Sequence, residues 1–295
     1  MITLNEAEAV DAGLSSVEER DESRVFQALD SLTGIAEDFV SENEEEDAAR
    51  VILSISDIAQ AAAQEGMELV AINSALALGK LSKAAAKKGY RSALNKAIIA
   101  TGKIGKSAAS SSLEAGSKVA ATTLMEIWKL SYPDEKDREE MIAFSLLLKD
   151  IGAAAASQGM EEALLNAVTC LGEVGKKEAE ESLETETINT LLLLEEIGGI
   201  AAEKYFDEAL SSVALSIEDT GKLSLKKGIR EAALQSQWAL ETLKIQAEEK
   251  FLENSPVVIE MALDSFKFTD IKETEENVTR LEEIKELQKK VYSSL

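Results

Sequence analysis

The octets SLTGIAED (31–38), SISDIAQA (54–61), ALGKLSKA (77–84) and ATGKIGKS (100–107) start 23 residues apart. After TLMEIWKL at 123 and one additional residue, the series continues as LLKDIGAA (147–154), CLGEVGKK (170–177), LLEEIGGI (193–200), SIEDTGKL (216–223) and ALETLKIQ (239–246). A constant period of this length is typical of folds in which one small structural unit is stacked many times. The repeat therefore decides the fold before any other feature is considered.

Each octet has the apolar spacing of a helix. Its second and fifth positions are apolar in all copies except for Thr101 and Thr220. The fifth position is occupied by Ile35, Ile58, Leu81, Ile104, Ile127, Ile151, Val174, Ile197, Thr220 and Leu243. Because residues three and four apart lie on one face of a helix, each unit is predicted to be a helix with one apolar stripe.

The helices are predicted to be joined by short turns. A Gly or Ser followed by an apolar residue precedes the octets in the pairs Gly66–Met67, Gly89–Tyr90, Ser112–Leu113, Gly159–Met160, Ser182–Leu183 and Gly228–Ile229. Glycine suits the left-handed residue that ends a helix, and the apolar residue after it packs against the next helix. About 20 helical residues span ~30 Å, which a joint of about three residues cannot retrace. Consecutive helices are therefore antiparallel neighbours.

The composition agrees with an all-α fold. Only 4% of the 295 residues are aromatic and two are Pro, while 45% are hydrophobic. Ala, Leu, Ile, Glu and Lys dominate, and most of these favour helices. We predict an α-solenoid of about 11 antiparallel stacked helices, with a capping helix at each end.

The repeat resembles the α-solenoids of the HEAT and armadillo families. The resemblance rests on the pattern L-x-x-[IV]-G, as in Leu148 to Gly152 and Leu171 to Gly175, and it covers about residues 20–268. Successive helices here share one motif instead of alternating between two, and the HEAT prolines are absent. By analogy of fold, the resemblance implies a protein-binding scaffold.

The chain is predicted to have four parts. Residues 1–20 form an N-terminal cap, 21–131 the first half of the solenoid, 132–268 the second half and 269–295 an amphipathic C-terminal capping helix. The boundary between the halves is placed in the polar segment KLSYPDEKDREE (129–140), where the period slips by one residue. An alternative for the last helix is that it protrudes and recruits a partner.

The charge limits the classes of partner. The net charge is −24, with 55 acidic and 31 basic residues, which disfavours nucleic acid. Cys170 is the single cysteine, so we expect a reducing compartment, the cytoplasm. No stretch of about 18 apolar residues and no signal-like start is present, so we expect no membrane association.

Catalytic chemistry has few candidates. The chain contains no His, which removes the commonest general base and zinc ligand. Cys170 occupies a small-residue position of the octet and is interpreted as a packing thiol. Paired carboxylates occur at Glu44–Asp47 and Glu195–Glu196, and we interpret both as solvated faces. No catalytic residue, cofactor or metal site is predicted.

The octet ATGKIGKS also resembles part of the phosphate-binding loop G-x-x-x-x-G-K-[ST]. Ala100 replaces the first glycine of that motif, and no strand precedes it. The same octet recurs throughout the chain as a helix. We therefore predict a helix here, with Gly102 and Gly105 inside it.

One segment is unusually basic. Between Gly79 and Ser112 there are eight basic residues and no acid. Antiparallel packing places Lys103 and Lys106 at the opposite edge from the rest. The candidate partner-binding basic cluster is therefore Lys80, Lys83, Lys87, Lys88 and Arg91. The alternative is that these lysines only complement the dipole at a helix C-terminus.

Three functional hypotheses follow. The first is a non-enzymatic scaffold that binds a protein or peptide partner, with the basic cluster as its leading contact. The second is a solenoid that binds a phosphorylated small molecule or nucleic acid, and that is an enzyme in some versions of this hypothesis. The third is a structural protein that self-associates through its acidic N-terminal end and the basic segment.

Overall fold

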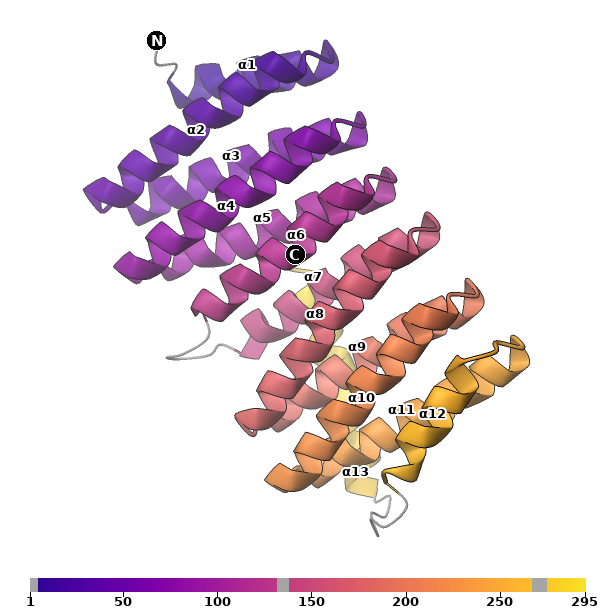
Figure 1. Ribbon diagram of the computed structural model, residues 1–295. Helices are drawn as coiled ribbons and strands as arrows, with labels where there is room; N and C mark the ends of the chain where they lie inside the picture. Colours follow the sequence, from indigo (N-terminus) through magenta and orange to yellow (C-terminus); the bar gives the residue numbers. More distant parts are fainter. Residues whose placement is uncertain (1–4, 132–137, 267–274) are drawn as a thin grey trace. The chain divides into compact units, whose positions relative to one another are not determined.

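The computed structural model describes residues 5–131, 138–266 and 275–295 of the chain. Within these ranges it contains thirteen α-helices and no strand, as the repeat predicted (Figure 1). The helices are α1 (Glu6–Glu18), α2 (Glu22–Glu42), α3 (Glu45–Gln64), α4 (Glu68–Lys88), α5 (Arg91–Ser110), α6 (Glu114–Ser131), α7 (Arg138–Ser157), α8 (Glu161–Glu180), α9 (Glu184–Glu203), α10 (Asp207–Lys227), α11 (Arg230–Glu249), α12 (Ser255–Asp264) and α13 (Glu275–Tyr292).

The chain divides into two compact units, Met1–Lys136 and Asp137–Leu295. Half of the polar segment 129–140, in which the boundary between the halves is predicted, lies outside the described residues. Each unit is a stack of helices with the same internal arrangement.

Each unit has two layers of helices. In the first unit every helix packs against the next one along the chain, and also against the second one along, as α3 does with α5 and α4 with α6. The odd-numbered helices therefore form one layer and the even-numbered helices the other. The second unit repeats this arrangement with α7, α9 and α11 in one layer and α8, α10 and α12 in the other. Figure 1 shows the even-numbered layer in front.

Helix α13 departs from the alternation. It packs against α7 and α9, on the side of the odd-numbered layer that faces away from α8 and α10 (Figure 1). Arg280 forms an ion pair of 3.1 Å with Glu184, and Gln288 donates a hydrogen bond of 2.9 Å to the side-chain oxygen of Asn189. Ile284 and Val291 of α13 itself are buried.

The octet positions form the core. Every second-position residue from Leu32 to Leu240 is buried, and so is every fifth-position residue from Ile58 to Leu243, Thr220 included. Burying one Leu or Ile stabilises the fold by roughly 1.5–3 kcal/mol when a neighbouring helix covers it. The stack is therefore held together by the ladder that the sequence displays.

The joints have the geometry predicted from their residues. Backbone φ is positive at Gly66, Gly89, Ser112, Gly159, Ser182 and Gly228. After each of these, the next backbone N–H donates to a carbonyl five residues earlier, as Met67 does to Ala62 at 2.9 Å. This pattern closes the end of each helix and turns the chain back.

Several helix N-termini are capped from the second preceding helix. The residues at the N-cap positions of α4, α5, α8, α9, α10 and α11 are apolar or aromatic and cap nothing with their side chains. At the start of α5, α6, α10 and α12, a carboxylate in the first turn of the second preceding helix accepts free backbone N–H groups. The N–H of Ser92 donates to Glu45 at 2.7 Å, and the N–H of Ala115 donates to Glu68 at 2.9 Å. These bonds tie helices of one layer together at their ends.

Candidate functional site

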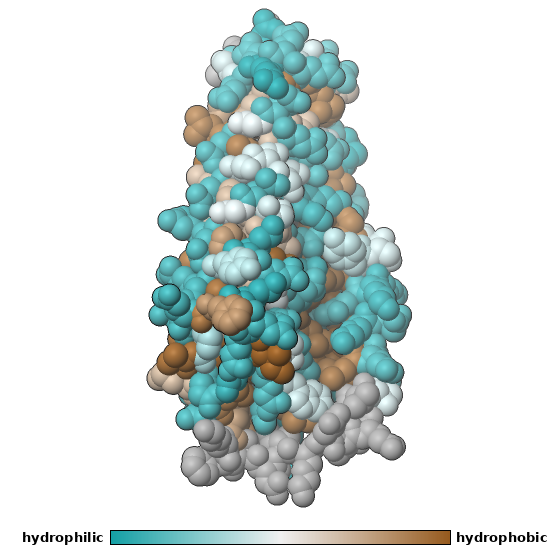
Figure 2. Space-filling view, turned by 90° about the vertical axis from the view of Figure 1, so that its right-hand side faces the viewer, coloured by the Kyte–Doolittle hydropathy of each residue, from teal (hydrophilic) through white to brown (hydrophobic). Residues whose placement is uncertain are grey.

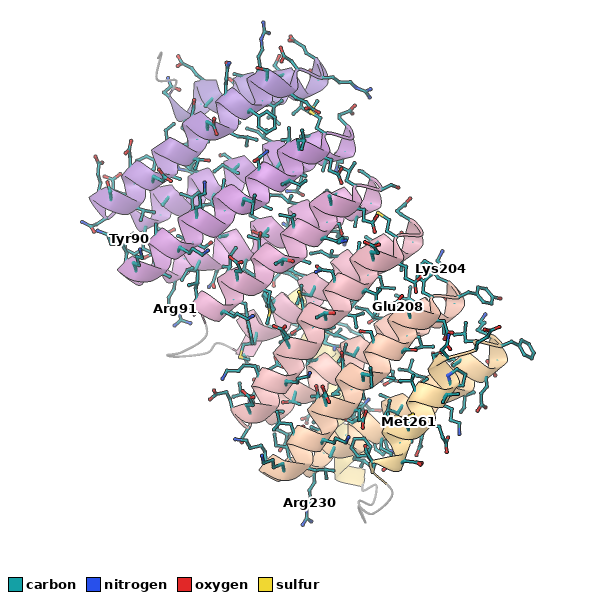
Figure 3. The ribbon with its side chains drawn as sticks, viewed as in Figure 1. Tyr90, Arg91, Lys204, Glu208, Arg230 and Met261 are labelled. Carbon is teal, nitrogen blue, oxygen red and sulfur yellow. The ribbon has the colours of Figure 1, made fainter. Side chains whose placement is uncertain are left out.

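The predicted basic cluster lies at the end of α4. Lys80, Lys83, Lys87 and Lys88 belong to the second half of α4, and Arg91 is the first residue of α5. All five residues are exposed. Figure 3 shows Tyr90 and Arg91 at the edge of the first unit where α4 ends.

Two of the lysines are held by neighbouring helices. Lys83 forms an ion pair of 3.1 Å with Glu126 of α6. Lys88 donates to the side-chain oxygen of Asn43 at 3.0 Å, and the Tyr90 hydroxyl donates to the same oxygen at 3.1 Å. Within the described ranges, Lys80 and Lys87 form no ion pair. These two ammonium groups are thus available to an acidic ligand.

The remaining bases of the segment belong to another layer. Lys96, Lys103 and Lys106 lie on α5, in the odd-numbered layer, whereas α4 is in the even-numbered layer. The acid-free segment from Gly79 to Ser112 is therefore shared between two layers. Lys80, Lys83 and Lys87 of α4 lie on one line along the helix, and the lysines of α5 do not extend it.

Two exposed leucines precede the lysines on α4. Leu69 is 57% exposed and Leu76 is 47% exposed. At 100° per residue, these leucines fall on one line along the helix with the three lysines at positions 80, 83 and 87. We call Leu69, Leu76, Lys80, Lys83 and Lys87 the α4 ridge. It is apolar in its first half and basic in its second.

Sequence analysis missed the apolar half of the ridge. The positions 69, 76, 80, 83 and 87 follow helical spacing, and none of them belongs to the core columns of the octet. A large apolar residue outside those columns was the available clue, because such a residue has no core to enter.

A groove opens in the second unit between α9, α11 and α13. Its volume is about 370 Å³, and its lining includes Glu195 and Gly199 of α9, Gln246 of α11 and Lys285 of α13. The side-chain oxygen of Gln246 is buried there with no hydrogen-bond donor. The groove exists because α13 covers only part of the odd-numbered layer.

Glu195 corrects one sequence-based prediction. The pair Glu195–Glu196 was expected to face solvent, and this holds for Glu196, which lies 3.1 Å from Lys149. Glu195 instead is half-buried beside the groove, where Gln235 donates to it at 3.0 Å. Burial raises the pKa of Glu195, although Lys285, Thr242 and Gln235 act in the opposite direction. Neighbouring residues on a helix point about 100° apart, so the two carboxylates do not act as a pair.

The other sequence candidates for chemistry are structural. Glu45 caps α5 and Asp47 forms an ion pair of 2.6 Å with Arg50, so the run Glu44–Asp47 is partly engaged in the fold. Cys170 is buried and is not in a disulfide. ATGKIGKS lies inside α5, where Gly102 and Gly105 are buried, so it forms a helix as predicted.

Two exposed aromatic side chains were also missed. Tyr205 and Phe251 have φ of 60° and 54°, at joints where other repeats carry Gly66 or Gly159. They are 65% and 90% exposed. Figure 2 shows a face on which hydrophilic side chains predominate and apolar ones stand in small groups. Aromatic residues in place of the joint glycine were the available clue.

No group of three His, Cys, Asp or Glu residues that could hold a metal ion occurs among residues 5–131, 138–266 and 275–295. None of the helices described for this chain is long and apolar enough to cross a membrane.

Comparison with known proteins shows the fold. No protein-family model and no curated protein matches the chain. A solved structure described as a circular tandem repeat protein with novel repeat topology and enhanced subunit contact surfaces has a TM-score of 0.53 and 14% identity, covering 96% of this chain and 71% of that one. A de novo designed helical repeat protein has a TM-score of 0.27 and 18% identity, covering 95% and 99%. The first of these likenesses shows that the chain has a helical-repeat fold.

Proposed function

We propose that this protein is a non-enzymatic helical-repeat scaffold that binds an acidic segment of a partner protein through the α4 ridge and the adjoining Lys88 and Arg91. The proposal extends to its location, the cytoplasm, where Cys170 stays reduced.

The composition of the α4 ridge is the observation that carries this proposal. Leu69 and Leu76 are exposed beside Lys80, Lys83 and Lys87 on one line of α4. Exposed apolar side chains next to charge are typical of interaction sites. In a chain of net charge −24, a line of lysines also attracts acidic partners selectively.

The leucines favour a polypeptide over a phosphate ligand. Lysines alone would attract a nucleotide or a nucleic acid equally well. An apolar side chain next to them adds affinity only for a ligand that has an apolar group at the matching place. A protein segment with an apolar residue beside its acids has this composition.

A capture experiment tests the proposal. The immobilised protein is exposed to native lysate, and the retained proteins are compared with those of the variant Lys83→Glu/Lys87→Glu/Lys88→Glu. The variant is expected to lose most of at least one retained acidic protein. The matched control is Lys96→Glu/Lys103→Glu/Lys106→Glu, which reverses the same number of charges on α5 and is expected to retain it.

Circular dichroism and a cooperative thermal transition establish that both variants are folded. The proposal is wrong if the α4 variant and the α5 control retain the same proteins in the same amounts.

A further inference from the structure

The second unit repeats the part of the α4 ridge that begins at Leu76, while Glu208 stands at the place of Leu69. Residues 76–91 read LALGKLSKAAAKKGYR, and residues 215–230, at the equivalent place in the repeat, read LSIEDTGKLSLKKGIR. The second stretch forms the end of α10 and the start of α11, as the first does for α4 and α5. Both stretches turn at a glycine with positive φ, 75° at Gly89 and 81° at Gly228.

The two stretches agree where they are exposed and differ where they are covered. The same seven positions are exposed in both, and six of these carry the same residue. The exposed identities are Leu76 and Leu215, Lys83 and Lys222, Lys87 and Lys226, Lys88 and Lys227, Gly89 and Gly228, and Arg91 and Arg230. None of the nine covered positions carries the same residue.

This distribution is the reverse of what folding alone produces. A repeat that serves only to stack keeps its covered residues alike, since they pack against the same neighbours, and its exposed residues vary. Gly89 and Gly228 are explained by the turn. The leucine, the three lysines and the arginine have no such explanation.

The helix dipole does not account for the lysines either. The dipole favours a base somewhere in the last turn, as Lys129 provides for α6 and Lys177 for α8, and does not require it at the positions of Lys87 and Lys88. The positions of Lys87 and Lys88 are occupied by Ser41 and Glu42 at the end of α2. At the end of α8 they are occupied by Glu180 and Glu181. The corresponding positions after α6 lie outside the described residues.

The side chains of the second stretch are accessible. Leu215 is 51% exposed, close to the value of 47% for Leu76. Lys222 pairs with Glu218 of its own helix, while Lys226 and Lys227 form no ion pair within the described part of the chain. Figure 3 shows Arg230 at the edge of the second unit where α10 ends.

Within the two stretches, one exposed position differs. Lys80 is replaced by Asp219, which forms an ion pair of 2.6 Å with Lys176 of α8. Together with Glu218, this makes the second copy less basic than the first. We expect the second copy to bind an acidic ligand more weakly.

We propose that the chain has two corresponding binding sites of unequal affinity. The stronger site consists of Leu76, Lys83, Lys87, Lys88 and Arg91, and the weaker site consists of Leu215, Lys222, Lys226, Lys227 and Arg230. Each binds an acidic polypeptide segment that carries an apolar residue ahead of its acids. The first site is that of the proposed function, on which this inference rests. The occupant follows from charge complementarity and from the leucine at the start of each copy.

The spacing sets the length of the segment. Eleven residues separate Leu76 from Lys87, and the same number separates Leu215 from Lys226, which is ~16 Å along a helix. An extended peptide covers this distance with about five residues.

A titration with a defined peptide tests the inference. The probe is a fluorescein-labelled peptide with the sequence Leu-Ser-Ser followed by four glutamates, and its stoichiometry on the full chain is measured at low ionic strength. Wild type is expected to bind two peptides, the second more weakly. One bound peptide per chain is expected to remain in Lys83→Glu/Lys87→Glu/Lys88→Glu, and likewise in Lys222→Glu/Lys226→Glu/Lys227→Glu. No bound peptide is expected to remain when both sets of substitutions are combined. The control variant Lys96→Glu/Lys103→Glu/Lys106→Glu is expected to bind two peptides, as wild type does.

Leu215→Ser provides a second variant that keeps every charge and removes only an exposed side chain. It should therefore fold, and it should weaken the second binding step alone.

Binding of one peptide per chain, lost in the α4 variant, would overturn the second site and leave the proposed function standing. No binding to wild type would overturn both. Binding that all variants keep would show diffuse attraction to the surface and overturn both sites. Salt-sensitive self-association, abolished by the two triple variants, would assign the sites to a second copy of the chain and overturn the proposed occupant.

Discussion

The Asp207 carboxylate, at the start of α10, accepts the backbone N–H of Ser255, at the start of α12, at 2.8 Å. It also accepts the N–H of Asn254 at 2.8 Å. The two helices are neighbours in one layer, so a side chain of one helix caps the second helix that follows it along the chain. Glu45, Glu68 and Glu161 make the same kind of bond elsewhere in the stack.

Replacing Asp207 is therefore expected to loosen the end of the second unit. Asp207→Asn removes a charged acceptor from two backbone donors, which we expect to cost about 1–3 kcal/mol of unfolding free energy in urea denaturation. Glu208→Gln, next to it and exposed, is the control and should change stability little. Equal stability of both variants would show that the bonds contribute nothing.

The same carboxylate predicts a pH dependence. Burial alone would raise the pKa of Asp207, but the hydrogen bonds from Ser255 and Asn254 outweigh it and the pKa is lowered. A lowered pKa in the folded state means that the stabilisation is present above the ordinary pKa of the group and is lost as the pH falls through the lowered value. The stability difference between wild type and Asp207→Asn should therefore shrink in acid. A difference that is the same at neutral and acidic pH would contradict this.

Glu195 should show the opposite sign. Burial raises its pKa, so its ionised form is disfavoured in the folded chain, and stability is lost as the pH rises through the raised pKa. Glu195→Gln removes the charge and should be more stable than wild type at neutral pH, with the gain vanishing in acid. The exposed Glu203→Gln serves as control, and thermal unfolding at several pH values measures the difference. A gain that persists in acid would exclude this cause.

Two glycines should respond to alanine in opposite ways. At Gly221 an added Cβ would lie 2.6 Å from the Cβ of Ser236, whereas at Gly34, inside α2, nothing lies within 4 Å. Gly221→Ala is expected to destabilise by roughly 1–3 kcal/mol through overpacking. Gly34→Ala is expected to stabilise by up to about 1 kcal/mol through helix propensity. Chemical denaturation of both variants checks the contrast, and equal effects would contradict it.

Tyr205 tests the strain at a joint. Its φ of 60° is a conformation that only glycine adopts without cost, and the side chain is exposed. Tyr205→Gly should therefore be more stable than Tyr205→Ala by roughly 1 kcal/mol, because alanine keeps the strain. If the alanine variant proves as stable as the glycine variant in thermal unfolding, the joint stores no strain.

Much of the fold could be predicted because the same pattern of core and joint residues occurs in many copies along the sequence. The columns that contain Ile58 and Leu78 identified the core, and Gly66 and Gly89 identified the joints. The hydrogen bond from the Ser255 N–H to the Asp207 carboxylate could not be predicted. The sequence indicates which residues share a helix, but it does not indicate which residues of the second helix along the chain they contact. The alternation of layers and the place of α13 were missed for the same reason.

The candidate site was predictable in its charge and not in its apolar part. Lys80, Lys83 and Lys87 stand out in an acidic chain, whereas Leu76 resembles any other leucine until its 47% exposure is seen. Glu195 and Glu196 look alike in sequence, but Glu195 is half-buried and accepts a hydrogen bond from Gln235 of α11, whereas Glu196 is exposed and pairs with Lys149.

Cross-linking from position 76 is the most direct test of whether the α4 ridge contacts an acidic partner protein. A photoreactive residue is placed at position 76 of the full chain, and a second chain carries it at position 30, where the exposed Asp30 occupies the same place in α2. A captured acidic protein should be cross-linked from position 76, through a segment rich in Asp and Glu. The same protein should not be cross-linked from position 30. Equal cross-linking from both positions, or from neither while the protein is still captured, would contradict this expectation.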